Sequence, residues 1–152
     1  MYEGTFDSRR SSSLIAALKS NVIMEVVSTM PIFRIFDLKK AREFYIEFLG
    51  FKVDWEYTLE PGSPTYMQVS RAGCILHLTE HHGDSCPGST VFLKVKGLED
   101  FHKELSDKQY PFNRPGIEMV PWNAKMMEVI DPFGNRLRFN EYLSSSARTE
   151  AA

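Results

Sequence analysis

Five side chains in this sequence are suited to hold a small organic molecule. A histidine can bind a metal or exchange a proton near neutral pH, and an arginine pairs with anions through a planar fork of N–H donors. A tryptophan offers a flat face for stacking against planar or cationic groups. The candidate ligand-binding residues are Trp55, His77, Trp122, Arg136 and Arg138. They can bind one ligand together only if the fold brings them to one surface.

His77 and Arg138 occupy matching places in a segment that occurs twice. Residues 72–80 align with residues 133–141, with Gly73 on Gly134 and with a leucine and a glutamate also matched. The stretch 31–36 parallels the stretch 90–95, and each is followed by an amphipathic helical pattern. Two copies of one β-α-β-β-β unit place equivalent residues symmetrically around whatever they enclose. The repeat therefore predicts that His77 and Arg138 face the same cleft.

The elements that position these residues follow from periodicity and from turn residues. Asp37 is a good helix N-cap, and Gly50 is a typical helix stop. The fold class that this predicts is α+β, with two β-α-β-β-β modules forming a curved mixed sheet around a central cleft. Strands are expected at 30–36, 51–57, 65–70, 74–79, 90–95, 118–120, 125–130 and 136–141, and helices at 38–49 and 98–108.

Alternation along the strands assigns the faces. Leu137 and Phe139 point one way, while Arg136 and Arg138 point the other. His77 likewise points away from its leucine neighbours. Because a helix covers the apolar face of each module, the opposite, semi-polar face is where a ligand would sit.

The two modules account for most of the chain. Residues 29–143 are predicted to form one domain, divided into 29–83 and 88–143. Residues 1–28 are either a disordered or a loosely docked arm, and residues 144–152 are expected to be a frayed tail.

Composition excludes several classes of protein. The 18 Lys and Arg against 20 Asp and Glu leave a formal charge of −2, which gives no reason to expect nucleic acid or an anionic membrane as partner. Cys74 and Cys86 fit no metal-finger spacing and indicate a reducing compartment. Without an apolar run of about 20 residues or a secretory signal, the expected location is the cytoplasm.

The ordered set of motifs resembles a known superfamily. The motifs are Asp37-Leu38 opening the first helix, Phe44-Tyr45 inside it, Leu49-Gly50-Phe51 ending it, and the turn 131–135 before the last strand. Together they resemble the vicinal oxygen chelate superfamily, which holds glyoxalase I, extradiol dioxygenases, fosfomycin-resistance enzymes and bleomycin-resistance proteins. The resemblance covers residues 30–143. Pro121-Trp122 and the Leu-Arg-Phe ending are most similar to the bleomycin-resistance branch.

The resemblance implies a metal position that this chain does not keep. Relatives hold one divalent cation at four symmetric positions, which here are Met30, His77, Thr90 or Val91, and Arg138. Only His77 is a plausible ligand, and a permanent cation at Arg138 would repel a metal. We therefore expect no metal, no cofactor and no catalytic residue. The resemblance implies a homodimer that sequesters a bleomycin-type drug or an unknown metabolite without metal chemistry, as in antibiotic resistance.

Other functions stay open at this stage. One is a glyoxalase-like lyase or isomerase, or a dioxygenase-type enzyme, with a non-standard ligand set such as His77, Glu128 and a loop histidine. Another is a small dimeric module once attached to a regulator. Arg138 would either form an ion pair with Glu128 or contact the ligand. His77 would either be a hydrogen-bonded residue on the sheet or contact the ligand. Both tryptophans would be either core residues or a stacking platform for the ligand. His77 and His81 match H-x-x-E-H, but on a strand they stand roughly 13 Å apart, which excludes a zinc-protease helix.

Overall fold

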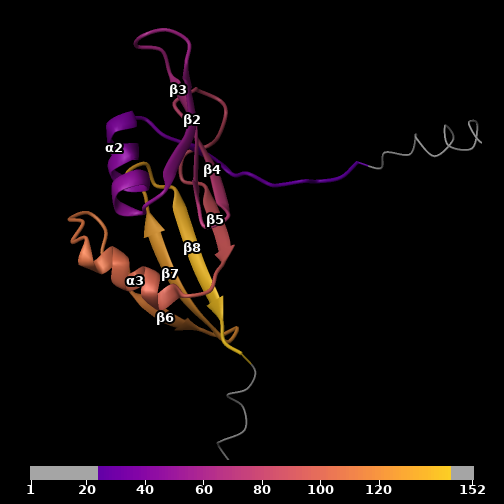
Figure 1. The fold of residues 1–152 in the computed structure, drawn as a ribbon, viewed down its shortest axis with the longest axis vertical. Coiled ribbons are helices and arrows are strands. Elements are labelled where there is room, and N and C mark those ends of the chain that lie inside the picture. The colour runs from indigo at the N-terminus through magenta and orange to yellow at the C-terminus, as the bar shows by residue number, and fades with distance from the viewer. Residues whose placement is uncertain (1–23, 145–152) are drawn as a thin grey trace, which may run out of the picture.

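A computed structural model describes residues 24–144, which form two four-stranded sheets (Figure 1). The first sheet has the order β1-β4-β3-β2 and the second the order β5-β8-β7-β6. β1 is parallel to β4 and β5 is parallel to β8, while the other pairs are antiparallel. The mixed sheets confirm the predicted α+β fold. The strands are β1 (Ile32–Arg34), β2 (Lys52–Thr58), β3 (Thr65–Arg71), β4 (Cys74–Thr79), β5 (Thr90–Lys94), β6 (Ile117–Val120), β7 (Ala124–Ile130) and β8 (Arg136–Tyr142).

Strand register confirms that the two sheets are copies of one unit. His77 lies between Ile32 of β1 and Gln68 of β3. Arg138 lies in the same way between Phe92 of β5 and Glu128 of β7. His77 and Arg138 are therefore equivalent, as the repeat predicted. The first strands, however, align as Ile32 with Phe92, so the stretch 31–36 matches 91–96 and the sequence alignment with 90–95 was wrong by one residue. The error arises because both stretches are apolar and only pairing fixes their register.

The first helical segment changes type along its length. Asp37 accepts a hydrogen bond from the Lys40 amide at 2.9 Å, which confirms the N-cap of α2 (Leu38–Arg42). The chain then continues as a π-helix, η1 (Glu43–Phe48), and the Leu49 amide bonds the Phe44 carbonyl at 2.8 Å. The wider turn leaves Phe44, Tyr45, Phe48 and Leu49 all buried. The single α-helix expected over 38–49 is therefore wrong in its second half.

The second helix, α3 (Leu98–Asp107), starts at Gly97, whose backbone is left-handed at φ 77°. The Glu141 carboxylate accepts from the amides of Gly97 and Leu98 at 2.8 and 3.1 Å. The negative charge of this carboxylate also stabilises the helix, because it lies at the positive, N-terminal end of the helix dipole.

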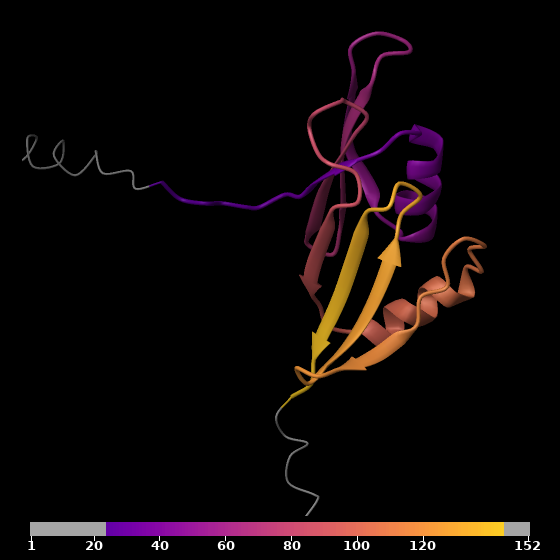
Figure 2. The same ribbon diagram turned by 180° about the vertical axis from the view of Figure 1, so that it is seen from behind.

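Both helices lie on the same side of the two sheets (Figures 1 and 2). The core lies between, and it includes Phe33, Met67, Leu76, Leu78, Met127, Val129 and Leu137, each at most 1% exposed. No helix of the described residues covers the opposite side. Large apolar side chains remain exposed there, among them Trp55, Tyr57, Phe92 and Ile130. We call this uncovered side of both sheets the open face.

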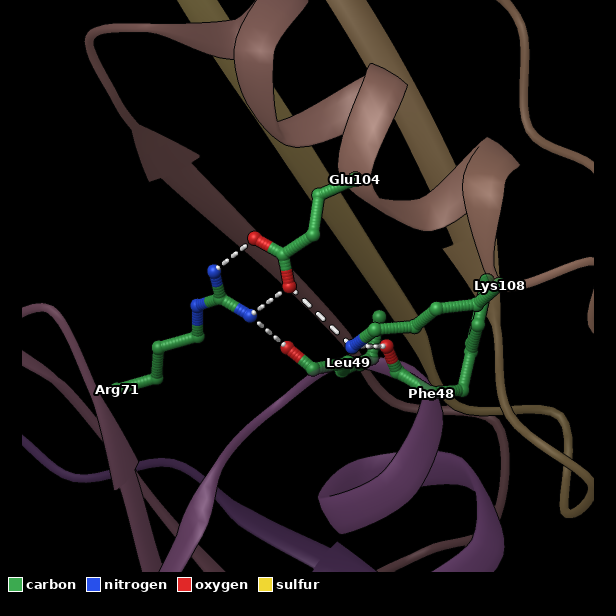
Figure 3. A network of polar contacts seen from close by, with 5 residues as sticks. All are labelled: Phe48, Leu49, Arg71, Glu104 and Lys108. Atoms are coloured by element: carbon green, nitrogen blue, oxygen red, sulfur yellow. Dashed lines mark hydrogen bonds and ion pairs between the residues drawn. The ribbon is translucent and has the colours of Figure 1, made fainter.

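One polar network joins the modules on the helix side (Figure 3). Arg71 of β3 binds both carboxylate oxygens of Glu104 in α3, at 2.9 and 2.6 Å. Arg71 also donates to the Leu49 carbonyl at 2.5 Å, and Lys108 donates to the Phe48 carbonyl at 2.7 Å. Cations from two elements thus satisfy the free carbonyls at the end of η1.

A second network, which we call the clasp, joins the modules at the turn before β8. The Tyr45 hydroxyl donates to Asp131 at 2.8 Å, and the Asn135 amide nitrogen donates both to Asp131 and to the Arg34 carbonyl at 2.8 Å. Asp131 also accepts from the Phe133 and Asn135 backbone amides at 2.8 and 2.7 Å. The Asp-Pro-Phe-Gly-Asn turn therefore holds the two modules together.

The chain before β1 runs away from the body of the molecule (Figures 1 and 2). Met24 and Val27 are 83% and 90% exposed, and β1 has only three residues where the sequence predicted seven. Most of the predicted arm and tail, residues 1–23 and 145–152, lie outside the described residues. No helix within residues 24–144 is long and apolar enough to cross a membrane.

Candidate functional site

His77 is held on the open face by two hydrogen bonds from β3. Its Nδ1 lies 2.9 Å from the Tyr66 hydroxyl, and its Nε2 lies 3.1 Å from the Gln68 amide oxygen. An amide oxygen only accepts, so Nε2 carries the proton and Nδ1 accepts from Tyr66. The Gln68 nitrogen then donates to Asp54 at 3.0 Å. His77 is thus one member of a polar chain that crosses three strands.

Trp55 completes an aromatic cluster with Tyr66 and His77. The indole stacks on Tyr66 with ring centroids 5.8 Å apart and an angle of 7°, and it meets His77 edge-on at 5.4 Å. The register of β2 shifts between Val53 and Trp55, which turns Trp55 to the open face opposite Gln68. The indole is 43% exposed, so Trp55 is not core and presents a free ring surface.

Partial burial sets the charge state of this cluster. It lowers the pKa of His77, so the imidazole is neutral at pH 7. Burial raises the pKa of Tyr66, and the nearby Asp84 carboxylate raises it further. Hydrogen bonds from Gln68 and Ser70 lower the pKa of Asp54. His77, Tyr66 and Gln68 are therefore neutral, and the nearby charges are the carboxylates of Asp54 and Asp84.

In the second sheet, Glu128 lies between two arginines. Its two oxygens accept from Arg136 and Arg138, each at 2.6 Å. These bonds, that from Arg138 foremost, lower the pKa of Glu128. The ion pair considered for Arg138 therefore exists. Two guanidinium groups against one carboxylate leave one positive charge, and the Arg138 side chain remains 44% exposed.

Trp122 is fixed by a residue that the sequence did not single out. The indole Nε1 donates to the Asn140 side-chain oxygen at 2.8 Å. Asn140 is fully buried, whereas Trp122 is 48% exposed, so this tryptophan is not core either. Strand alternation, which puts Asn140 on the face of Arg138, was the signal that could have identified it. The same alternation on β3 could have identified Tyr66 and Gln68.

The site residues form separate groups in one chain. Trp55 and His77 belong to the first sheet. Arg136 and Arg138 belong to the second sheet, and Trp122 lies in the turn between its strands β6 and β7. Among residues 24–144, no hydrogen bond, ion pair or ring contact joins the two groups. The predicted meeting of His77 and Arg138 around one cleft stays a prediction.

Comparison with known proteins identifies the family. A family profile described as glyoxalase superfamily protein matches residues 16–146. The chain belongs to the glyoxalase superfamily. No curated protein sequence matches this glyoxalase superfamily member.

Solved structures share the fold of this superfamily member. A bleomycin resistance determinant encoded on the transposon Tn5 is 20% identical with a TM-score of 0.62, and a bleomycin-binding protein complexed with bleomycin is 21% identical with a TM-score of 0.59. Each match covers 78% of this chain and 100% of the other. TnmS3, an antibiotic binding protein from Streptomyces sp. CB03234, is 21% identical with a TM-score of 0.55, over 79% of this chain and 100% of the other. At these identities the likeness concerns the fold.

The metal-binding positions of metal-dependent superfamily members do not fit a metal here. Met30 and Thr90 offer a thioether and a hydroxyl, and the Arg138 guanidinium is committed to Glu128. Both ring nitrogens of His77 are already hydrogen-bonded. In the part of the chain that the structure describes, no three His, Cys, Asp or Glu side chains gather as a metal site requires. The alternative set of His77, Glu128 and a loop histidine is therefore not assembled.

Proposed function

We propose that this protein binds a small organic molecule on the open face and sequesters it without metal chemistry. The observation that carries the proposal is the pair of exposed tryptophans, each oriented by neighbouring side chains. Trp55 is stacked on Tyr66, and Trp122 is hydrogen-bonded to Asn140. Oriented aromatic rings beside a few polar groups are typical of small-molecule sites. The named properties of the bleomycin-binding and antibiotic-binding neighbours support the same class of ligand.

The charges divide the candidate ligands into two classes. A planar, cationic drug of the bleomycin type would stack on the tryptophans and would be repelled by the positive charge that Arg136 and Arg138 leave beside Glu128. An anionic metabolite would use that charge through bidentate hydrogen bonds. His77, whose ring nitrogens are both bonded within the protein, offers either class a neutral ring beside Trp55.

The active form in this proposal is a two-fold homodimer. Within residues 24–144 no helix covers the open face of either sheet, and Tyr57, Phe92 and Ile130 are 58%, 47% and 40% exposed there. Apolar groups of this size on one side of a molecule mark an interaction surface. Two chains related by a two-fold axis would cover each other's open faces and bring the site groups of both sheets into paired clefts.

A thermal-shift panel combined with elemental analysis tests the proposal. The as-purified protein is mixed with bleomycin-type drugs and with cationic and anionic aromatic metabolites. A ligand at 100 times its Kd stabilises the folded state by about 2.7 kcal/mol, which is easily measured. We expect at least one such shift with substoichiometric metal. A tightly held divalent metal that contacts His77 would overturn the proposal and favour an enzyme.

A further inference from the structure

A groove lies on the helix side of the molecule, away from the open face. It has a volume of about 530 Å³ and runs between the β3–β4 turn and the start of α3. Its walls are formed by Arg71 and Cys74 of the first module and by Leu93, Val95, Phe101 and Phe139 of the second. We call it the seam groove. Its volume falls within the range of roughly 300–1,000 Å³ that is usual for small-molecule sites.

The seam groove is a place where the second module is less completely covered than the first. The register makes Leu93 equivalent to Phe33 and Val95 equivalent to Ile35. Phe33 and Ile35 are fully buried, whereas Leu93 and Val95 are only partly buried. The same apolar face is thus closed by protein in one copy of the unit and left open in the other.

The floor of the seam groove is aromatic and aliphatic. Phe101 and Phe139 meet edge-to-face with centroids 5.1 Å apart. Phe101 is partly exposed beneath the Arg71 guanidinium, whose central carbon lies 4.7 Å from its ring centre. These rings form no hydrogen bonds with a ligand, and free energy is gained when a ligand removes their apolar surface from water. The floor therefore favours an apolar ligand.

The charges of the residues that line the seam groove cancel except for that of Lys94. Arg71 is neutralised by Glu104 through two hydrogen bonds. Lys96 and Asp100 on the rim carry opposite charges, and the Lys94 ammonium lies 5.5 Å from the Tyr142 ring. Alternation along β5 turns the Lys94 side chain away from Leu93 and Val95, and Tyr142 is not a groove residue, so this one unbalanced charge lies outside the groove. A neutral molecule therefore complements the groove best.

The two walls are also held in place before anything binds. Arg71 belongs to the wall from the first module and Glu104 to the wall from the second, and Figure 3 shows the bonds that join them. A fixed pair of walls loses little conformational entropy on binding, which favours affinity.

We propose that the seam groove is a second ligand site, independent of the open face, for a small, neutral, apolar molecule. An aromatic or branched aliphatic compound would lie on Phe101 and Phe139 between the two modules. No bond to the protein is formed or broken, and binding depends on contact and on the exclusion of water.

Cys74 provides a local readout of occupancy. Its thiol lies in the groove wall and burial raises its pKa, whereas Cys86 is exposed in a loop. In a Cys86→Ser variant, the rate of alkylation by N-ethylmaleimide at pH 8.5 reports on Cys74 alone. The probe is N-phenyl-1-naphthylamine, which is neutral, apolar and fluorescent in dry surroundings.

We expect one saturable probe site per chain and an approximately tenfold slower alkylation of Cys74 at ten times the probe Kd. Val95→Trp should fill the groove and abolish both signals, and near-UV circular dichroism confirms its fold. Trp122→Ala, on the open face, should leave the protection of Cys74 unchanged. The protection assay itself needs no groove variant, so it decides the question even if Val95→Trp does not fold.

Three outcomes would overturn the proposal. Probe binding without protection of Cys74 would place the probe elsewhere. Stronger protection by the anionic probe 8-anilinonaphthalene-1-sulfonate would contradict a neutral ligand. A Cys74 that is unreactive without probe and becomes reactive on dilution would show that a second copy of the chain covers the groove.

Discussion

Replacing Tyr45 by phenylalanine should measure the strength of the clasp between the two modules. The hydroxyl is the only atom removed, and it donates to Asp131 at 2.8 Å. Tyr45 is fully buried and Asp131 is 4% exposed, so water cannot replace the lost donor. Burial raises the pKa of Tyr45 well above its ordinary value, which keeps the hydroxyl protonated at every working pH.

The expected loss of stability follows from the partners that remain. A hydrogen bond to a charged group contributes about 1.5–3 kcal/mol. In the variant both oxygens of Asp131 keep a donor, Oδ1 from the Phe133 and Asn135 amides and Oδ2 from the Asn135 side chain. Because no carboxylate oxygen is left bare, the loss should lie at the lower end, about 1.5–2 kcal/mol. For a chain of this length that corresponds to a melting temperature lower by about 3–8 °C.

Urea unfolding at pH 7, followed by circular dichroism, gives the free energy of unfolding directly. Tyr110→Phe is the matched control, because in the described structure the Tyr110 hydroxyl has no hydrogen bond while its ring stacks on Phe48 at 4.5 Å. That variant should stay within about 0.5 kcal/mol of the parent. If Tyr45→Phe were no more destabilising than Tyr110→Phe, the clasp would contribute nothing and the argument would be refuted.

The other predictions concern acid stability, the site and assembly. Hydrogen bonds, the one from Arg71 foremost, lower the pKa of Glu104 from 4.5 to about 2, so its contribution is complete above pH 4.5 and is lost as the pH falls towards 2. Urea midpoints of Glu104→Gln should therefore fall less steeply over that range than those of the parent, and equal slopes would contradict the assignment. By calorimetry and with the fold intact, Trp122→Ala should weaken the binding of a planar cationic ligand, and Arg138→Ala that of an anionic ligand, by about 1–3 kcal/mol. Unchanged binding of every candidate by both variants would show that the site is misassigned. Light scattering at micromolar concentration should give the mass of two chains, with an interface above about 1,000 Å² in total, and a monomer would exclude the homodimer.

Most elements of the fold could be predicted from patterns of residues that are close together in the sequence. β4 was predicted with its observed ends, Cys74–Thr79, because Leu76, His77, Leu78 and Thr79 alternate between apolar and polar side chains and Gly73 marks the turn before the strand. Asp37 was recognised as a cap because a carboxylate before a helical pattern has few other roles. The equivalence of His77 with Arg138 followed from the repeated segment. These features depend on residues close together in the sequence.

Features that depend on distant residues were missed. The wider turns of η1 occur where the helix buries four large side chains against both modules. Local helix propensities do not predict such a change of helix type. The first strand was predicted from residue 30, yet β1 starts at Ile32 and Met30 is 37% exposed. The bonds of His77 to Tyr66 and Gln68 require the register of β3 on β4, and that of Trp122 to Asn140 requires the turn before β7 to reach β8.

The clasp also imposes an order of events during synthesis. Tyr45 and Asp131 are 86 residues apart in the chain, and ribosomes add about 5–20 residues per second, so Tyr45 is made roughly 4–17 s before its partner. Through that interval the Tyr45 hydroxyl has no Asp131 carboxylate to donate to. A chain that stops before the turn at Asp131 therefore contains the whole first module but lacks the clasp that joins it to the second, and we expect it to be more open to chaperones and proteases than the complete chain.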